Sequence, residues 1–448
     1  MGRLFGTDGV RGVANRDLTP ELALKIGRAT ACVLTDSGKQ PKILIGCDTR
    51  ASGDMLECAL CAGFCSVGAD VILLGVVPTP AVAYLVGKLH ADAGVMISAS
   101  HNPCEFNGIK IFSGEGYKLP DALEEEIENL VFDESGLPEL PERGGVGNVK
   151  ERYDAIDLYI RHIEDSAPNR LEGLRVAIDC ANGSASRTAE KIFTDLGAEC
   201  HMLACEPNGV NINDDCGSTH MENLMDFVVK NGLDAGIAFD GDADRCLAVD
   251  ENGQLVDGDF MMAICALDMK SRGVLKHDTV VGTVMTNMGF TKFCKDNGLN
   301  FVATKVGDRY VLEEMLLKGY SFGGEQSGHY IFREFATTGD GQLSAVQFLS
   351  ILSRRHARLS SLTTVMERYP QVLVNVRVSN DGKRRFYTDA EVRTAVQRAE
   401  ELLGEDGRLL VRPSGTEPLL RVMTEGRDHG MITRIANDVA DVIRDRLV

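Results

Sequence analysis

The chain has 448 residues, 44% of them hydrophobic, and a formal net charge of −19 at pH 7. This length predicts several domains, each with its own core, and the acidic balance argues against nucleic acid and anionic membrane surfaces as partners. The 13 cysteines lack the spacing of metal-binding fingers, which is typical of reduced thiols in a cytoplasmic protein. The sequence contains no stretch of about 18 apolar residues and no apolar leader, so we expect a cytoplasmic protein without a membrane span.

One pattern of strand, loop and helix occurs three times along the chain. A short apolar strand runs into a loop containing glycine and then a helical pattern, and a second strand follows. The first strands are predicted at 42–48, 175–179 and 279–284, and the second strands at 70–77, 199–204 and 301–305. Such alternation predicts α/β domains with mixed, mostly parallel sheets. A weak threefold internal repeat is our preferred interpretation, although ordinary α/β alternation gives a similar pattern.

Two breaks divide the chain further. A segment rich in proline and glycine, 136–147, precedes an amphipathic helix predicted at about 153–162, and a second break falls at Tyr369 and Pro370. Beyond the second break, short strands, a charged helix at about 389–403 and a last helix predict a smaller α+β domain. We therefore predict four domains, at 1–157, 158–257, 258–369 and 370–448.

The first segment that carries chemistry follows an apolar strand predicted at 93–97. It contains Ser100 and His101. Pro103 then keeps Asn102 out of helical dihedral angles, which predicts an exposed loop. Open α/β sheets bind ligands at the carboxyl ends of their strands, so Ser100 is our candidate nucleophile. Taken alone, serine and histidine in a loop are more typical of a polar turn.

Three aspartates leave a second apolar strand together. Asp240, Asp242 and Asp244 follow the apolar run 235–238 and precede another strand-like segment, 246–249. In an extended backbone, residues two apart point to one side, roughly 6–7 Å from each other, and carboxylates so placed repel unless a cation lies between them. Oxygen ligands without histidine suit a hard ion such as Mg²⁺.

An EF-hand is the competing interpretation of this segment. The three aspartates and Glu251 match the first, third, fifth and twelfth positions of that loop, but its sixth position requires glycine and is Arg245 here. The strand-like flanks also argue against an EF-hand. We therefore predict a catalytic magnesium site, with a solvated acidic turn as the remaining alternative.

A third polar segment lies between two strand-like runs near the C-terminus. Its sequence is Arg412-Pro413-Ser414-Gly415-Thr416-Glu417-Pro418, and Arg421 follows. Arginine and hydroxyl groups bind phosphate, and glycine lets backbone N–H groups approach an anion. The segment is therefore a candidate phosphate-binding loop, although a hairpin turn has the same composition.

Four segments together resemble the signature motifs of the α-D-phosphohexomutase superfamily. They are ISASHNP at 97–103, DGDADR at 240–245, GGEQSGH at 323–329 and RPSGTEP at 412–418. The resemblance implies three similar α/β domains and a smaller fourth, arranged as a heart with a central cleft. Within the superfamily, segment 5–12 and Gln326 are most similar to members that interconvert glucosamine 6-phosphate and glucosamine 1-phosphate, a reaction that feeds UDP-N-acetylglucosamine and cell-wall synthesis.

The resemblance implies a role for each residue of the serine and metal segments. The implied catalytic residues are Ser100, His101, Lys110 and Arg11, and the implied metal ligands are Ser100, Asp240, Asp242 and Asp244. Ser100 would carry a phosphoryl group whose oxygen helps to hold one Mg²⁺ per chain. One of the other catalytic residues would act as general acid or base and the others as electrostatic stabilisers, and the sequence leaves open which. Arg245 would order the metal loop or meet the phosphoserine, with a surface salt bridge as the alternative.

Sugar recognition is implied for a different loop. Glu325 and Ser327 would bind two ring hydroxyls, although a glycine-rich turn with a buried glutamate is also compatible with a purely structural role. Neighbouring candidates for the same pocket are His329, Lys305, Gly307, Asp308, Arg309 and Arg245. The distal phosphate would be bound by Arg412, Ser414, Gly415, Thr416 and Arg421. A hinge near Pro370 would let the last domain open and close.

The expected chemistry is phosphoryl transfer through a 1,6-bisphosphate, with Ser100 primed by a hexose 1,6-bisphosphate or by autophosphorylation. The expected partners are an amino sugar phosphate and, in a homodimer, a second copy of the chain. A phosphomannomutase/phosphoglucomutase activity and a sugar-phosphate sensor without turnover are the alternatives.

One segment departs from the family pattern. Cys104-Glu105-Phe106 stands where the related mutases have aromatic residues and an aspartate. Because Gly108 and Lys110 keep their register, we expect activity to survive, with a possible effect on sugar preference or on phosphoserine stability.

Overall fold

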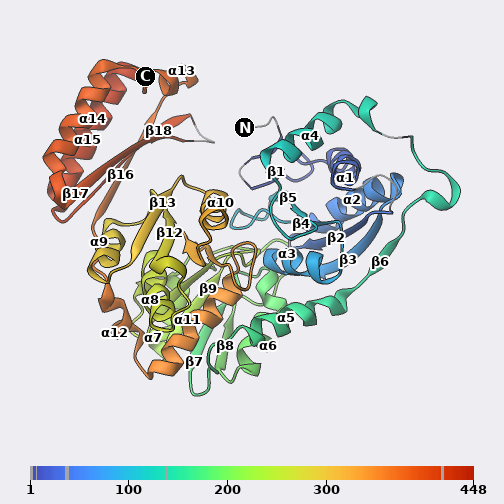
Figure 1. The fold of residues 1–448 in the computed structure, drawn as a ribbon, viewed down its shortest axis with the longest axis horizontal. Coiled ribbons are helices and arrows are strands. Elements are labelled where there is room, and N and C mark those ends of the chain that lie inside the picture. The colour runs from blue at the N-terminus through green and yellow to red at the C-terminus, as the bar shows by residue number, and fades with distance from the viewer. Residues whose placement is uncertain (1–3, 7, 36–39, 138, 415–417) are drawn as a thin grey trace. The chain divides into compact units, whose positions relative to one another are not determined.

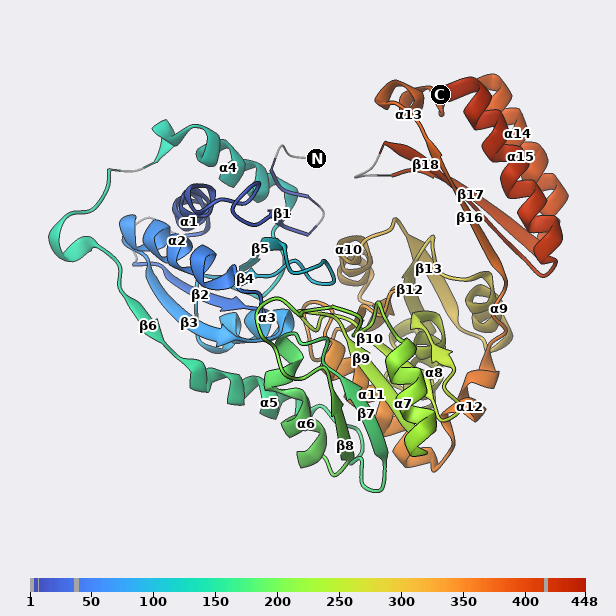
Figure 2. The same ribbon diagram turned by 180° about the vertical axis from the view of Figure 1, so that it is seen from behind.

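The computed structural model describes residues 4–6, 8–35, 40–137, 139–414 and 418–448. Figures 1 and 2 show its helices and strands from opposite sides. The chain forms two compact units, residues 1–285 with 299–364 and residues 286–298 with 365–448. In the described ranges, no helix combines the length and apolar character needed to cross a membrane.

The first sheet has the strand order β1-β5-β4-β2-β3-β6. Strands β2, β3, β4 and β6 run parallel to one another. At one edge, β5 is antiparallel to β4, and β1 is antiparallel to β5. Because side chains alternate along a strand, Ile43 and Ile45 join the core shared with α1, α2 and α4, whereas Gly46 and Gly94 contact α3 on the other face. The strands are β1 (Val10–Val13), β2 (Lys42–Cys47), β3 (Asp70–Val76), β4 (Ala93–Ile97), β5 (Phe106–Ser113) and β6 (Val149–Glu151), and the helices are α1 (Pro20–Leu34), α2 (Gly53–Ser66), α3 (Thr79–Lys88) and α4 (Asp121–Phe132).

The second sheet has the order β11-β10-β9-β7-β8. Its strands β7, β8 and β9 run parallel, and β10 and β11 are antiparallel at the edge. Leu224 and Val228 of α7 pack on Ala177, Ala238 and Val249 of this sheet. The strands are β7 (Arg175–Asp179), β8 (Glu199–Leu203), β9 (Ala235–Phe239), β10 (Cys246–Asp250) and β11 (Leu255–Val256), and the helices are α5 (Ile156–Asp165), α6 (Ala189–Asp195) and α7 (Glu222–Asn231).

The third sheet has the order β13-β12-β14-β15, with only β15 antiparallel to its neighbour. Helix α11 is buried along most of its length, and Asp340 caps its N-terminus by accepting a hydrogen bond from the Leu343 N–H. The strands are β12 (Thr279–Thr283), β13 (Asn300–Thr304), β14 (Phe322–Gly324) and β15 (Tyr330–Phe332), and the helices are α8 (Gly258–Ser271), α10 (Asp308–Lys318), α11 (Gly341–Arg355) and α12 (Leu359–Leu362).

The second unit contains an antiparallel sheet in the order β16-β18-β17. Helices α14 and α15 lie along this sheet, on one side of it in Figure 1. Helix α9 belongs to this unit, because the Asn287 side chain forms hydrogen bonds of 3.0 Å with both the N–H and the carbonyl of Tyr369. The elements are α9 (Met288–Asp296), β16 (Gln371–Arg377), α13 (Asn380–Arg385), α14 (Ala390–Leu403), β17 (Gly407–Pro413), β18 (Leu419–Gly426) and α15 (His429–Leu447).

The three sheets of the first unit share one topological position. In each, the chain leaves a parallel strand, forms a loop and returns as an antiparallel neighbour. These loops, 98–105, 240–245 and 325–329, connect β4 to β5, β9 to β10 and β14 to β15. They are the three segments of this unit that the sequence marked as chemical, so their equivalent positions support the threefold repeat.

The predicted strands are confirmed, but the sequence did not predict β1, β5, β6, β11, β14 and β15. The predicted ranges 93–97 and 175–179 coincide with β4 and β7, and the predicted helix at 389–403 is α14 with Asp389 as its N-cap. Strand β6 was not predicted, because its three residues, Val149, Lys150 and Glu151, are exposed and are too few to show a periodic pattern of apolar side chains.

Candidate functional site

Ser100 lies in the loop after β4 with a φ of +55°. Few residues other than glycine adopt this left-handed conformation, so the surrounding contacts must hold it. The Ser100 N–H donates to Ser98 Oγ at 3.0 Å, and the Ser100 carbonyl accepts from Arg50 Nη2 at 3.0 Å and from Asn213 Nδ2 at 2.9 Å. These bonds fix the backbone and leave the hydroxyl directed away from it.

Arg50 holds the whole serine loop and was missed by the sequence analysis. Its fully buried guanidinium pairs with Asp48 Oδ2 at 2.9 Å and also donates to the carbonyls of Asn102 at 2.8 Å, Phe106 at 3.0 Å and Pro103. The only available signal was a pair of opposite charges immediately after a buried strand, at the position where the chain turns into α2.

Asp240, Asp242 and Asp244 lie together in the loop between β9 and β10. All three are buried, and one carboxylate oxygen from each lies within 4.8 Å of the others. Among the described residues, Oδ1 of Asp242 and Oδ1 of Asp244 are buried without a hydrogen-bond partner. Burial and the neighbouring Asp244 and Asp242 raise the pKa of Asp240 well above its usual value. A divalent cation bound by oxygen ligands would relieve this repulsion, so the residues present fit such an ion.

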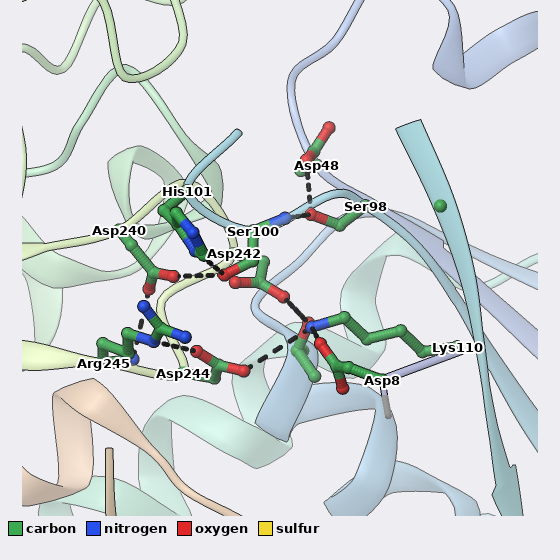
Figure 3. Close-up of polar contacts among 12 residues, drawn as sticks. Asp8, Asp48, Ser98, Ser100, His101, Lys110, Asp240, Asp242, Asp244 and Arg245 are labelled. Carbon is green, nitrogen blue, oxygen red and sulfur yellow. Dashed lines mark hydrogen bonds and ion pairs between the residues drawn. The ribbon is translucent and has the colours of Figure 1, made fainter. Parts of the chain in front are cut away.

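The serine and the aspartates meet directly (Figure 3). Ser100 Oγ lies 2.5 Å from Asp240 Oδ2, and His101 Nδ1 lies 3.4 Å from Ser100 Oγ. Burial and the nearby Arg245 and Arg11 lower the pKa of His101 to about 4. The imidazole is therefore neutral at pH 7 and able to accept a proton.

Lys110 reaches the same cluster from β5. Its Nζ lies 2.7 Å from Asp242 Oδ2, 3.0 Å from Asp8 Oδ2 and 3.5 Å from Asp244 Oδ2. Burial alone would lower the pKa of Lys110, but the three carboxylates together raise it. Arg11 also pairs with Asp8. The cations expected at the serine site are thus already held by carboxylates.

Arg245 contacts two of the three aspartates of the metal loop. Its backbone N–H donates to Asp240 Oδ1 at 3.1 Å, and its Nε lies 3.9 Å from Asp244 Oδ1. Glu251, the twelfth position of the rejected EF-hand, points elsewhere and bonds to Ser360.

The loop with Glu325, Ser327 and His329 adjoins the metal loop. The Cys246 N–H donates to the Gly328 carbonyl at 2.8 Å, which joins the start of β10 to this turn. Ser327 is exposed and Glu325 is half-buried, so both can meet a ligand, whereas His329 is buried. The loop 305–309 lies beside them, because the Gly307 N–H donates to Glu325 Oε1 at 3.1 Å.

Two further candidates in this loop are already engaged within the protein. Lys305 Nζ lies 5.6 Å from the centre of the Tyr310 ring. Arg309 forms ion pairs with Asp121 and Glu124 of α4 and with Glu313. A cavity of about 210 Å³ borders the same loop and α4.

The candidate phosphate-binding residues lie on the β17–β18 hairpin of the second unit. Arg412 and Arg421 face each other across the two strands, and burial together with the Arg421 charge lowers the pKa of Arg412. Two guanidinium groups so close together favour an anion between them. Ser414 is buried, and its carbonyl accepts from Lys383 Nζ at 2.7 Å, a contact that the sequence did not suggest. Gly415 and Thr416 lie outside the described residues.

Family models match four consecutive segments of the chain, and known proteins match its whole length. Family models for phosphoglucomutase/phosphomannomutase match residues 2–137 (alpha/beta/alpha domain I), 157–253 (domain II), 257–369 (domain III) and 373–442 (C-terminal domain). The chain is 53% identical over 447 residues to the phosphoglucosamine mutase of Caldanaerobacter subterraneus subsp. tengcongensis and 54% identical over 448 residues to that of Acetivibrio thermocellus, with 100% of each chain covered. Its fold is similar to a phosphoglucomutase/phosphomannomutase family protein from Burkholderia thailandensis, with a TM-score of 0.82, 24% identity and 98% and 97% of the two chains covered.

Proposed function

Because this chain belongs to the phosphoglucomutase/phosphomannomutase family of phosphohexomutases, we propose that it interconverts glucosamine 6-phosphate and glucosamine 1-phosphate. The single observation that carries the chemistry is the Ser100 hydroxyl, held 2.5 Å from Asp240 within a cluster of three buried aspartates. The choice of an amino sugar rests on the relatives that share more than half of their residues with the whole chain.

The reaction uses one phosphoserine for both ends of the sugar. Phosphoserine 100 transfers its phosphoryl group to O1 of glucosamine 6-phosphate: the bond from phosphorus to Ser100 Oγ breaks, the bond from phosphorus to O1 forms, and the O1 proton passes to a base. The 1,6-bisphosphate then turns end for end. In the second transfer the bond from phosphorus to O6 breaks, the bond from phosphorus to Ser100 Oγ forms, and the proton that Ser100 Oγ took up after the first transfer passes to O6. Glucosamine 1-phosphate then leaves.

The residues around Ser100 supply what phosphoryl transfer needs, namely positioning and charge neutralisation. Lys110, which pairs with Asp242, and Arg11, which pairs with Asp8, would balance the negative charge of the phosphoryl group. The neutral imidazole of His101, 3.4 Å from Ser100 Oγ, is our candidate base for the sugar hydroxyl proton. Asp240, Asp242 and Asp244, with an oxygen of phosphoserine 100, would hold Mg²⁺, which when bound polarises the phosphoryl group.

The remaining predicted residues bind the sugar at its other positions. Glu325 and the exposed Ser327 bind two ring hydroxyls, and Arg412, Ser414 and Arg421 bind the distal phosphate together with Gly415 and Thr416. We propose the domain division 1–157, 158–257, 258–369 and 370–448, in which each domain contributes one of these loops. A hinge near Pro370 lets the last domain open and close.

We also propose that the enzyme works in the cytoplasm. In the described chain all 13 cysteines are free thiols, and free thiols in this number are typical of a reducing compartment.

A substrate panel tests the function. Purified enzyme, with trace amounts of the matching 1,6-bisphosphate, is assayed on glucosamine 1-phosphate, glucose 1-phosphate and mannose 1-phosphate, and its intact mass is measured in parallel. We expect the highest kcat/KM with glucosamine 1-phosphate and one added phosphoryl group per chain. A preference for mannose or glucose 1-phosphate would instead support a phosphomannomutase/phosphoglucomutase, and binding without turnover of all three would support a sensor.

A further inference from the structure

Lys118, in the connection between β5 and α4, bridges two carboxylates from distant parts of the first unit. Its Nζ lies 2.6 Å from Asp8 Oδ1 and 2.5 Å from Asp308 Oδ2. Only 14% of the Lys118 side chain is exposed, and the two aspartates are exposed by 21% and 17%. The sequence motifs did not include Lys118, and the proposed function assigns it no role.

The two carboxylates lead to different functional loops. Asp8 Oδ2 lies 3.0 Å from Lys110 Nζ, and the same Nζ lies 2.7 Å from Asp242 in the metal loop. On the other side, Asp308 directly follows Gly307, whose N–H donates to Glu325 Oε1 at 3.1 Å. Lys118 is therefore at the centre of a path from the aspartate cluster to the candidate sugar-recognition glutamate, made of polar contacts and of the peptide bond between Gly307 and Asp308.

The charge of Lys118 keeps the two carboxylates together. Without the ammonium group, Asp8 and Asp308 would face each other across the same small volume, where burial and mutual repulsion both disfavour two negative charges. Segment 307–309, where α10 begins, would then move away from Asp8. It would not detach, because Arg309 still pairs with Asp121 and Glu124 of α4. The expected consequence is a displaced loop in a folded protein.

A displaced loop would misplace Glu325. Gly307 has a φ of +129°, a conformation that only glycine adopts readily. The direction of its N–H is set by the path of the backbone at this turn. If Asp308 shifts, the bond from Gly307 to Glu325 Oε1 loses its geometry, and the glutamate no longer presents a fixed oxygen to a sugar hydroxyl.

We propose that Lys118 is a positioning residue that sets the sugar-recognition loop relative to the serine and metal site through Asp308 and Asp8. This proposal rests on the function proposed above. Lys118 contacts Asp8 and Asp308, and it acts through these two carboxylates.

The test compares phosphoryl transfer to sugar with transfer to water. Phosphorylated enzyme is mixed with glucosamine 1-phosphate, and the loss of the phosphoryl group from Ser100 to the sugar and to water is measured separately by mass spectrometry and product assay. In Lys118→Met we expect kcat/KM for glucosamine 1-phosphate to fall at least tenfold, and transfer to sugar to fall at least tenfold relative to transfer to water. A general loss of stability would lower both transfers together.

Three companion variants sharpen the result. Lys118→Arg, which keeps a cation between the carboxylates, should restore most of the transfer to sugar. Asp308→Asn should lower it as Lys118→Met does, and the double variant should be no worse than the more impaired single variant, because both changes remove one contact. Lys191→Met is the matched control, since it breaks an ion pair of 2.6 Å with Asp195 on the surface of α6 and should behave like the unmodified enzyme.

The outcomes separate this proposal from the function on which it rests. An unmodified enzyme without activity on glucosamine phosphates would refute the proposed function. An active unmodified enzyme whose Lys118→Met variant keeps the same ratio of transfer to sugar and to water would overturn the positioning role. If Lys118→Met does not fold, the Lys118→Arg and Asp308→Asn variants decide: equal activity in Asp308→Asn and the unmodified enzyme contradicts the proposal.

Discussion

Ser100 Oγ lies 2.5 Å from Asp240 Oδ2, although 140 positions separate the two residues in the chain (Figure 3). Backbone contacts hold this arrangement. A side chain on Gly241 would come within 2.6 Å of the Ser100 carbonyl, so the two loops are in direct contact. The Thr79 N–H and hydroxyl, at the start of α3, bond to the carbonyl and carboxylate of Asp242 at 2.9 and 2.5 Å. The site is therefore built by docking two rigid loops.

Replacing the proposed nucleophile should abolish turnover. In Ser100→Ala no oxygen remains to carry the phosphoryl group, so we expect kcat to fall by about three orders of magnitude or more and the added phosphate to disappear from the intact mass. Ser98→Ala, on the same loop, is the comparison: it should keep the phosphate on Ser100, although a slower reaction is expected because Ser98 Oγ accepts the Ser100 N–H. Phosphate retained on the Ser100→Ala protein would contradict the assignment.

Arg50 should matter for both stability and rate. Arg50→Leu leaves the Asp48 carboxylate buried without its partner, and removal of one member of a buried ion pair costs about 3–5 kcal/mol. We expect a large drop in the free energy of unfolding, measured by urea denaturation. Arg50→Lys should fold better but lower kcat, because an ammonium group cannot reach all the loop carbonyls that the guanidinium binds.

The control for Arg50 is Arg16→Leu. Arg16 also pairs with its neighbouring aspartate, but the side chain is 71% exposed, so the free energy of unfolding should stay nearly unchanged. Equal effects of the buried and the exposed substitution would show that the serine loop does not depend on Arg50.

Metal removal should inactivate the enzyme reversibly. Dialysis against a chelator should abolish turnover, and Mg²⁺ should restore it. Calorimetry should give one Mg²⁺ per chain, with at least tenfold weaker binding in Asp244→Asn. The metal-free Asp244→Asn protein should be no less stable than the unmodified one, because Asp244 Oδ1 is buried without a hydrogen-bond partner and its charge repels Asp240. The exposed Asp226→Asn is the control, and identical Mg²⁺ affinities in the two variants would argue against the aspartate site.

The arginines of the β17–β18 hairpin should govern substrate affinity. Arg412→Gln removes one of two facing guanidinium groups, so we expect KM for glucosamine 1-phosphate to rise at least tenfold, with a smaller change in kcat. Arg393→Gln, on the exposed side of α14, should leave both constants unchanged. A KM unaffected by the Arg412 substitution would show that the hairpin does not bind the substrate phosphate.

Asp340 should make the free energy of unfolding depend on pH. Burial raises the pKa of Asp340 from 3.8 to about 7, with a further contribution from Asp244, against the hydrogen bonds from the Leu343 N–H and the Tyr159 hydroxyl. Between these two values the folded state keeps a proton that the unfolded state has released. The contribution of Asp340 to stability therefore falls as pH rises from about 4 to 7 and levels off above 7.

Asp340→Asn tests this linkage, since asparagine keeps the N-cap but cannot titrate. We expect the unmodified protein to lose stability relative to the variant by at most about 1.4 kcal/mol per pH unit in that window, measured by urea unfolding at several pH values. Parallel curves for the two proteins would mean that Asp340 does not hold the proton.

Much of the site could be predicted because its segments are local patterns. An apolar run followed by Ser100, or by three alternating aspartates, needs only about ten residues to be recognised, and the four segments in order identified the superfamily, which the family models and relatives confirm. The individual roles of these residues, the domain boundaries, the priming route and the homodimer stay predictions.

The partners of charged residues could not be predicted. Arg309 was a candidate for the sugar-recognition pocket, yet it forms ion pairs with Asp121 and Glu124, almost 190 positions away. None of the four sequence motifs contains Arg50, Lys118 or Lys383. Each is identified only by what the fold places beside it.

The sequence by itself determined the alternation of strands and helices, the loops that carry hydroxyl, carboxylate and guanidinium groups, and the family. These follow from periodicity and residue type within short segments. Only the tertiary structure decided that Ser100 meets Asp240, that Arg50 holds the serine loop and that Lys118 joins Asp8 to Asp308. The physical reason is that such contacts depend on how strands and sheets pack, and residues 50 or more positions apart leave no local pattern that reveals their contact.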